Sequence, residues 1–382
     1  MKKSKKNKQL GLAGVMAVSI ILGIVLGILA AKYLPEILNI NEFLAIFLCI
    51  IAAYVQIVIH EAGHLVFGLV SGYKFSSFRI GNIMIAKYGN KMKVKFFKIP
   101  GTGGQCIMIP PDLKKDKMPF VLYGYGGCIA NIITSILFII LCLCFPNNGY
   151  VASICVALAT IGIVAALLNG IPLKLGGICN DGYNVMAQKK EPKAMRAMWT
   201  QLSANNRLMQ GESLKTIPED WLYMPDEKGL NNTIIATIGV FYANKLLVME
   251  EFDKTIKTID KLISEDNEVL ELHKKLLICD KIFCILMTNN DSQEIDKLNN
   301  KEQIKFMKQM KKYPSVLRTQ YALELIHKGN LEESKKIKAT FEKVGKNYPY
   351  SGDIQDERNL MALCDEKMKS TLGNGSQIKT QE

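Results

Sequence analysis

Four long apolar runs occupy the first half of the chain and constrain its fold more than any other feature. They lie at about 10–31, 43–70, 120–145 and 151–170. Each approaches or exceeds the roughly 20 residues that a membrane-spanning helix needs. A cleaved signal peptide is the alternative for the first run, but a signal peptide usually has only about 7–15 apolar residues. We therefore predict an α-helical polytopic membrane domain with about four transmembrane helices over residues 1–185.

The positive charge of the chain belongs to this membrane half. Residues 1–180 hold 17 Lys/Arg and 5 Asp/Glu, whereas residues 181–382 hold 31 and 30. An excess of +12 against +1 excludes a nucleic-acid surface and matches the positive-inside rule. The loop from Lys74 to Lys117 contributes ten of the basic residues, and the connections 33–42 and 146–150 contribute none. We expect a multi-pass protein of the bacterial cell membrane with both termini in the cytoplasm.

The loop at 72–112 changes to a period of two residues. Ile83–Tyr88 and Lys91–Phe96 flank a Gly-Asn turn, which predicts a membrane-associated β-hairpin, with a further short strand at Gln105–Ile109. Two interpretations remain open for this hairpin. It lies on the lipid surface with Lys91, Lys93 and Lys95 facing water and headgroups, or one edge strand pairs with an extended substrate beside a metal site.

The sequence of residues 190–366 predicts a soluble, all-α cytoplasmic domain. Two stretches have small, turn and aliphatic or aromatic residues at similar spacing. The first contains Ala243, Phe252 and Ile256, and the second contains Ala322, Gly329, Leu331 and Ser334. The spacing resembles a tetratricopeptide-like helical hairpin, and an ordinary amphipathic bundle is the alternative. We expect the domain to select or regulate substrates and to offer a site for a protein partner. Polar residues dominate 367–382 and predict a disordered tail.

The motif His60-Glu61-Ala62-Gly63-His64 lies inside the second apolar run. On a helix this HExxH spacing places both imidazoles on one face with the carboxylate beside them. Ionisable side chains are rare in membrane spans and are usually functional there. Catalytic zinc usually takes three protein ligands and keeps one position for water. Asp181 is the candidate third ligand, because the end of the fourth run reaches the same cytoplasmic depth as His64.

These motifs resemble the site-2 protease family of intramembrane zinc metalloproteases. The resemblance covers about residues 42–185 and includes an NxxP segment, Asn169-Gly170-Ile171-Pro172, followed by Asp181-Gly182, and a glycine-rich stretch, Gly126 to Asn131. It implies zinc ligands at His60, His64 and Asp181 and a catalytic base at Glu61. Asp181 follows Asn169 by twelve residues instead of about eight, which requires an extra turn or bulge near Gly176-Gly177, and Cys128 replaces a common proline.

The expected function is zinc-dependent cleavage of a membrane-spanning or membrane-anchored protein or peptide near the cytoplasmic face. The lipid bilayer is then the second partner. Asn131 and Asn169 are candidates for binding substrate backbone or the oxyanion, or for hydrogen bonds between helices. The alternative function is a non-catalytic membrane scaffold that binds a partner through its cytoplasmic helical domain.

Overall fold

The computed structural model describes residues 41–378, except 98, 100–101, 115–116, 146–147 and 176–177. It divides the chain into two compact units. The membrane unit comprises residues 41–81, 99–112 and 118–190, and the helical unit comprises residues 82–97, 113–117 and 191–378. The predicted first span at 10–31 lies outside the described residues.

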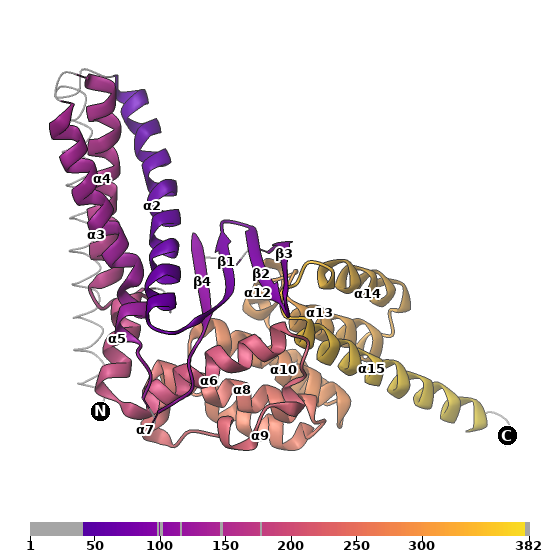
Figure 1. The fold of residues 1–382 in the computed structure, drawn as a ribbon. Coiled ribbons are helices and arrows are strands. Elements are labelled where there is room, and N and C mark those ends of the chain that lie inside the picture. The colour runs from indigo at the N-terminus through magenta and orange to yellow at the C-terminus, as the bar shows by residue number, and fades with distance from the viewer. Residues whose placement is uncertain are drawn as a thin grey trace. The chain divides into compact units, whose positions relative to one another are not determined.

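Three helices of the membrane unit are long and apolar enough to cross a membrane, and they match the other three predicted runs. They are α2 (Glu42–Val70), α3 (Val121–Cys144) and α4 (Gly149–Gly170). The helices lie side by side (Figure 1). Asn41 and Asn148 cap α2 and α4 by accepting hydrogen bonds from the backbone N–H groups of Leu44 and Val151. The prediction of a helical membrane protein is confirmed.

Large apolar side chains cover the outward faces of these helices. Phe43, Phe47 and Ile50 of α2 are exposed, as are Leu137 and Leu143 of α3. Water would penalise such a surface, whereas lipid tails accept it.

Two short antiparallel pairs complete the membrane unit together with α5 (Asp181–Lys190). Strand β1 (Lys74–Ile80) pairs with β4 (Gly104–Ile109), so the short strand predicted at Gln105–Ile109 is confirmed. Strands β5 (Lys174–Leu175) and β6 (Ile178–Cys179) form a small hairpin between α4 and α5.

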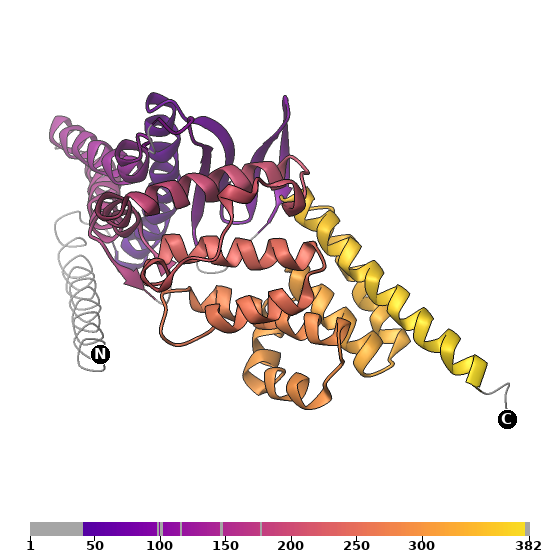
Figure 2. The same cartoon turned by 90° about the horizontal axis from the view of Figure 1, so that it is seen from below.

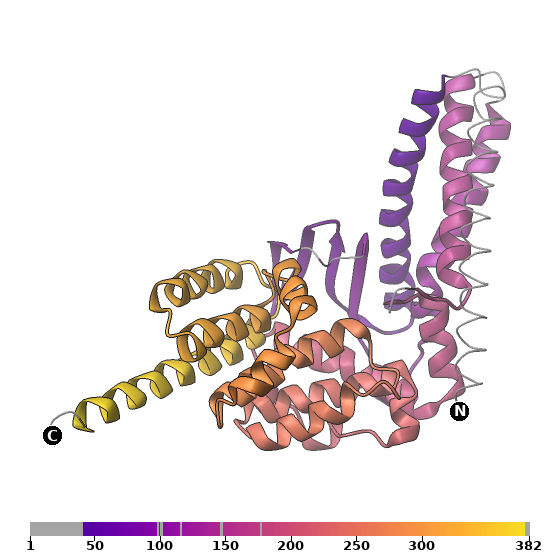
Figure 3. The same ribbon diagram turned by 180° about the vertical axis from the view of Figure 1, so that it is seen from behind.

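The helical unit contains a succession of packed helices (Figures 2 and 3). The regular helices are α6 (Pro192–Met209), α7 (Glu227–Leu230), α8 (Thr233–Val248), α9 (Phe252–Leu262), α10 (Glu271–Met287), α11 (Ser292–Leu298), α12 (Lys301–Gln309), α13 (Pro314–Ala322), α14 (Leu331–Gly345) and α15 (Ser351–Ile378). Short 3-10 turns, η1 (Leu214–Thr216) and η2 (Glu219–Trp221), join α6 to α7, and a π-helical turn, η3 (Leu323–His327), extends α13. The buried apolar side chains of the unit form several clusters, of which the largest involves α10, α13 and α15. Phe283 and Phe341 are fully buried in the core.

The predicted hairpin consists of β2 (Ile83–Tyr88) and β3 (Lys91–Phe96), but it belongs to the helical unit and not to the membrane unit. Met84 and Ala86 are buried against Met209 of α6, and the Tyr88 hydroxyl donates to the carbonyl of Pro349. Lys91, Lys93 and Lys95 lie on the same face of the hairpin as Met84 and Ala86, so the face that we expected to meet water and headgroups is the one that packs on the helical unit. Lys95 donates a hydrogen bond to the Lys346 carbonyl there.

Helix α15 continues to Ile378, although the polar composition of 367–382 predicted disorder. Contacts at the start of that segment explain the difference. The Lys367 ammonium group donates to the carbonyls of Leu286, Met287 and Thr288, which end α10. Met368 packs against the apolar core. The polar composition of the segment does not show that Lys367 and Met368 contact the rest of the helical unit.

Candidate metal centre

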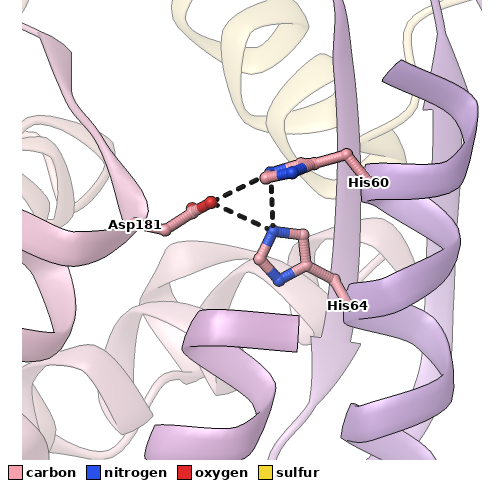
Figure 4. A group of neighbouring side chains, drawn as sticks. All are labelled: His60, His64 and Asp181. Atoms are coloured by element: carbon pink, nitrogen blue, oxygen red, sulfur yellow. Dashed lines mark hydrogen bonds and ion pairs between the residues drawn. The ribbon is translucent and has the colours of Figure 1, made fainter. Parts of the chain in front are cut away.

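Three side chains predicted from the sequence meet in the membrane unit. Nε2 of His60 lies 2.9 Å from Oδ2 of Asp181, Nε2 of His64 lies 3.3 Å from the same oxygen, and the two nitrogens are 3.2 Å apart. Figure 4 shows the histidines projecting from one helix and the aspartate reaching them from another segment. Helix α2 supplies both imidazoles because a separation of four residues keeps them on one face.

The remaining ring nitrogens bind acceptors that fix the imidazoles. Nδ1 of His64 donates to the carbonyl oxygen of Tyr123, at 2.7 Å. Nδ1 of His60 lies 2.7 Å from Oδ1 of Asn131. Since a carbonyl oxygen only accepts, both rings present Nε2 to the centre. Such acceptors orient metal-binding histidines and set their tautomer.

A chain of hydrogen bonds extends this support across all three long helices. The Asn131 amide donates to Oε1 of Gln56 at 2.7 Å, and the Gln56 amide donates to the carbonyl of Leu158 at 2.8 Å. Gln56 and Asn131 are both buried, at 1% and 0% exposure. Gln56 is not among the residues predicted from the sequence, although it is a lone polar residue in an apolar run, one helical turn before His60.

Asn180 explains how Asp181 reaches the histidines despite the long spacing from Asn169. Its amide donates to the carbonyls of Leu168 and Ile171, at 2.7 and 2.6 Å, and its side-chain oxygen accepts from the backbone of Tyr183. These bonds tie the end of α4 to the start of α5. The β5–β6 hairpin accommodates the additional residues in between. The turn or bulge that we expected at Gly176-Gly177 itself lies outside the described residues.

The environment of Asp181 keeps its carboxyl group ionised. Burial alone would raise its pKa, but the hydrogen bonds with His60 and His64 outweigh burial and hold the pKa well below its ordinary value. A carboxylate must be ionised to bind a metal. Both Nε2 atoms face the Asp181 carboxylate, so a bound cation would meet two imidazole nitrogens and one carboxylate oxygen.

Glu61 lies beside this group against the first residue of β4. It is buried at 8% exposure, and a Cβ atom added at Gly104 would come within 2.6 Å of its side chain. The guanidinium group of Arg79 donates to the Gly104 carbonyl at 3.1 Å and is itself fully buried. Arg79 is not among the residues predicted from the sequence, because its contact with Gly104 depends on the pairing of β1 with β4.

The glycines of the predicted glycine-rich stretch allow α3 to approach the histidines. A Cβ atom at Gly126 would lie 2.7 Å from the carbonyl oxygen of Gly63 in α2, and one at Gly127 would lie 2.5 Å from the His60 ring. Real side chains essentially never make such short contacts, so any larger residue displaces α3 or the imidazole.

The structure does not join Asn169 to the cluster by any hydrogen bond among the described residues. Its amide donates to the carbonyl of Ala165, one turn earlier in α4. The other asparagine candidate, Asn131, uses its amide group for His60 and Gln56 instead.

The donor set fits zinc. Tetrahedral ligands at the usual zinc distances of about 2.0–2.2 Å lie about 3.3–3.6 Å from one another. The three ligating atoms are 2.9–3.3 Å apart, so small outward movements suffice. His60, His64 and Asp181 would hold the ion and leave one tetrahedral position free.

A spanning helix that carries two histidines and a glutamate, with an aspartate from the following segment beside them, is typical of a metallopeptidase of the membrane. The chain belongs to peptidase family M50, the site-2 protease family, whose model matches residues 48–342. This confirms the resemblance noted in the sequence and supports a metalloprotease activity. No curated protein and no solved structure matches the chain.

Proposed function

We propose that this protein is a zinc-dependent intramembrane protease that cleaves a membrane-spanning or membrane-anchored polypeptide near the cytoplasmic face. The convergence of His60, His64 and Asp181 beside Glu61 carries this proposal. Family membership favours it over a non-catalytic scaffold.

The residues have distinct roles in the proposed hydrolysis. His60, His64 and Asp181 hold zinc, which when bound lowers the pKa of water and polarises a carbonyl group. Glu61 accepts a proton as the water oxygen attacks the scissile carbonyl carbon. When the carbon–nitrogen bond breaks, Glu61 donates that proton to the departing amine nitrogen. No hydrogen bond or ion pair with another described side chain competes for the Glu61 carboxylate.

The strand next to Glu61 is β4, and we propose that its free edge binds the substrate. Among the described strands β4 pairs only with β1 and forms an edge of its sheet. A substrate helix must unwind before its carbonyls are accessible, and an edge strand offers hydrogen bonds to the extended segment. The hairpin β2–β3, for which we first considered this role, packs on the helical unit instead.

We assign different roles to the two asparagines. Asn131 positions His60, because its amide is already engaged with His60 and Gln56. Asn169 remains the candidate for substrate contact, since only one of its amide hydrogens is used in the bond to Ala165.

The membrane topology and the helical unit complete the proposal. The run at 10–31 would form a fourth span, with both termini in the cytoplasm and the metal centre in the cytoplasmic third of the bilayer, about 27 Å from the outer end of α2 at 1.5 Å per residue. The exposed apolar face of the hairpin, which includes Ile85, Val94 and Phe96, suits a lipid surface. The helix pairs α8–α9 and α13–α14 support a tetratricopeptide-like unit that binds a protein partner.

Glu61→Gln tests the proposed function. The variant should bind zinc as the wild type does and should no longer cleave membrane substrates, because an amide cannot accept the proton. Quantitative membrane proteomics of cells carrying either protein should show polypeptides that accumulate only with Glu61→Gln. Glu366→Gln, an exposed position on α15, serves as the control. Undiminished cleavage by Glu61→Gln, or wild-type protein without stoichiometric zinc, would refute the mechanism.

A further inference from the structure

A cavity of about 360 Å³ lies within the helical unit. Helices α6, α8, α10, α13 and α15 all contribute lining residues. Its volume falls in the range of about 300–1,000 Å³ that ligand pockets occupy. The proposed protease mechanism makes no use of this cavity.

The charge of the cavity wall is strongly unbalanced. Four carboxyl groups line it, from Asp280, Asp353, Asp356 and Glu357, and none of the lining residues is a lysine or arginine. The buried guanidinium group of Arg318 neutralises part of this charge by binding Asp280 and Glu357, at 2.5 and 2.8 Å. Four carboxyl groups against one guanidinium leave an excess of three acidic groups.

Two of these carboxyl groups have no cation of their own. Asp356 accepts a hydrogen bond from the backbone N–H of Leu214, which is neutral. Asp353 makes no ion pair with any residue in the described part of the chain. A carboxyl group enclosed in this way either has a cationic partner or holds its proton, because burying an unpaired charge is costly.

Two further lining side chains have an enclosed polar atom without a partner. Oδ1 of Asn244 and Nδ1 of His273 are shielded from solvent and make no hydrogen bond to the described residues. Buried polar groups are almost always hydrogen-bonded, so such exceptions need an explanation. Burial lowers the pKa of His273 to about 4, which leaves its ring neutral and adds no positive charge to the cavity. The unmet bonds are independent of the acidic groups and also indicate a ligand.

We propose that this cavity binds a polypeptide segment that presents a lysine or arginine side chain. The carboxyl groups of α10 and α15 would receive the cation. Asn205 and Asn244 on the neighbouring helices α6 and α8 offer amide groups to the backbone of an extended segment, and the aromatic rings of Phe241, Tyr313 and Tyr348 offer faces for its apolar parts. The proposal rests on the helical unit alone and does not depend on the metal centre.

The protonation of Asp353 supports a cationic ligand. Burial, followed by the charges of Glu357 and Asp356, raises its pKa to about 8. Asp280, His273 and Arg318 are the other ionisable groups on the facing helices, together with the two tyrosines. At pH 7 the Asp353 carboxyl is therefore largely protonated, and an arriving cation favours its ionised form. Binding at pH 7 should release a proton.

Fluorescence anisotropy with the full-length protein in non-ionic detergent tests the proposal. The probe is a short fluorescein-labelled peptide of alternating lysine and phenylalanine, and the comparison peptide carries glutamate in place of lysine. The wild type should bind the lysine peptide selectively. Asp353→Asn should weaken binding about tenfold or more, the size expected for one charge-assisted hydrogen bond. Calorimetry in buffers of different ionisation enthalpy should detect proton release by the wild type and a smaller release by Asp353→Asn.

Controls separate this role from a structural one and from protease activity. Glu366→Gln removes one charge from the exposed part of α15 and should bind as the wild type does. Asp353→Asn should retain the wild-type melting temperature or exceed it, so lost binding is not lost folding. Glu61→Gln should bind the peptide normally even if the proposed catalysis is wrong. The proposal would be overturned if Asp353→Asn bound the lysine peptide as tightly as the wild type does, or if the glutamate peptide bound as tightly as the lysine peptide. It would also be overturned if neither peptide bound, or if the protein bound the small polycation spermidine but not the lysine peptide.

Discussion

Replacing Gly127 with alanine is the most direct structural test of the metal centre, because it changes no ligand. The new Cβ atom would lie 2.5 Å from Cε1 and Nε2 of His60. An ordinary contact starts at about 3.4 Å. The imidazole ring or helix α3 must therefore move by about 1 Å, whereas metal–ligand distances tolerate about 0.2 Å.

The expected result is zinc binding weakened by about 10–100-fold, the range seen when groups that orient a metal ligand are lost. This corresponds to about 1.4–2.8 kcal/mol, at about 1.4 kcal/mol per factor of ten. Competition with a chromogenic zinc chelator measures the affinity on purified protein in detergent, and circular dichroism reports whether the helices persist.

Gly170→Ala is the matched control at the end of α4. A Cβ atom there would lie 3.6 Å from the sulfur atom of Cys128, which is an ordinary contact. This variant should keep the zinc affinity of the wild type. If Gly127→Ala also binds zinc with wild-type affinity, then the close approach of α3 to His60 does not determine the site, and the reasoning fails.

Three further perturbations separate the parts of the protein. Gly104→Ala should retain zinc but slow cleavage by about 100-fold, because its Cβ would displace Glu61 and not a ligand; unchanged turnover would contradict this. Asn131→Ala should weaken zinc binding by about 10–100-fold by removing the acceptor for His60, and restored affinity in Asn131→Asp would support that role over simple packing. Since the pKa of Asp353 rises from 3.8 to about 8 on folding, the wild type should lose stability as the pH rises between these values, by up to about 1.4 kcal/mol per unit. The stabilising effect of Asp353→Asn on the melting temperature should therefore be larger at pH 8 than at pH 4.5.

The parts of the site that depend on residue spacing within one helix could be predicted from the sequence. The spacing of His60 and His64 within one helix places both rings together, whatever the rest of the chain does. Asp181 was predicted from the depth at which the fourth apolar run ends, and the structure brings it to the histidines. The contribution of Asn180 was not predictable, because it depends on which carbonyls the end of α4 leaves open.

The hairpin shows the limit of a pattern with period two. Alternation correctly predicted β2 and β3 and the division of their side chains between two faces. It did not say which face is covered. The face with Met84 and Ala86 packs on Met209, 125 residues further along the chain from Met84. The apolar residues Val94 and Phe96 on the opposite face are exposed. Only the tertiary structure of the helical unit determines this choice.

The metal centre and the association of the membrane helices depend on the same hydrogen bonds. Gln56, Asn131 and His60 form a continuous chain that ends on the Leu158 carbonyl, and it connects α2, α3 and α4. In an apolar environment each unpaired member would cost several kcal/mol, so the helices gain stability from the geometry that orients His60. The polar groups required for chemistry therefore also contribute to folding. Substitutions at Gln56 should alter helix packing and zinc affinity together, although Gln56 does not contact the metal position.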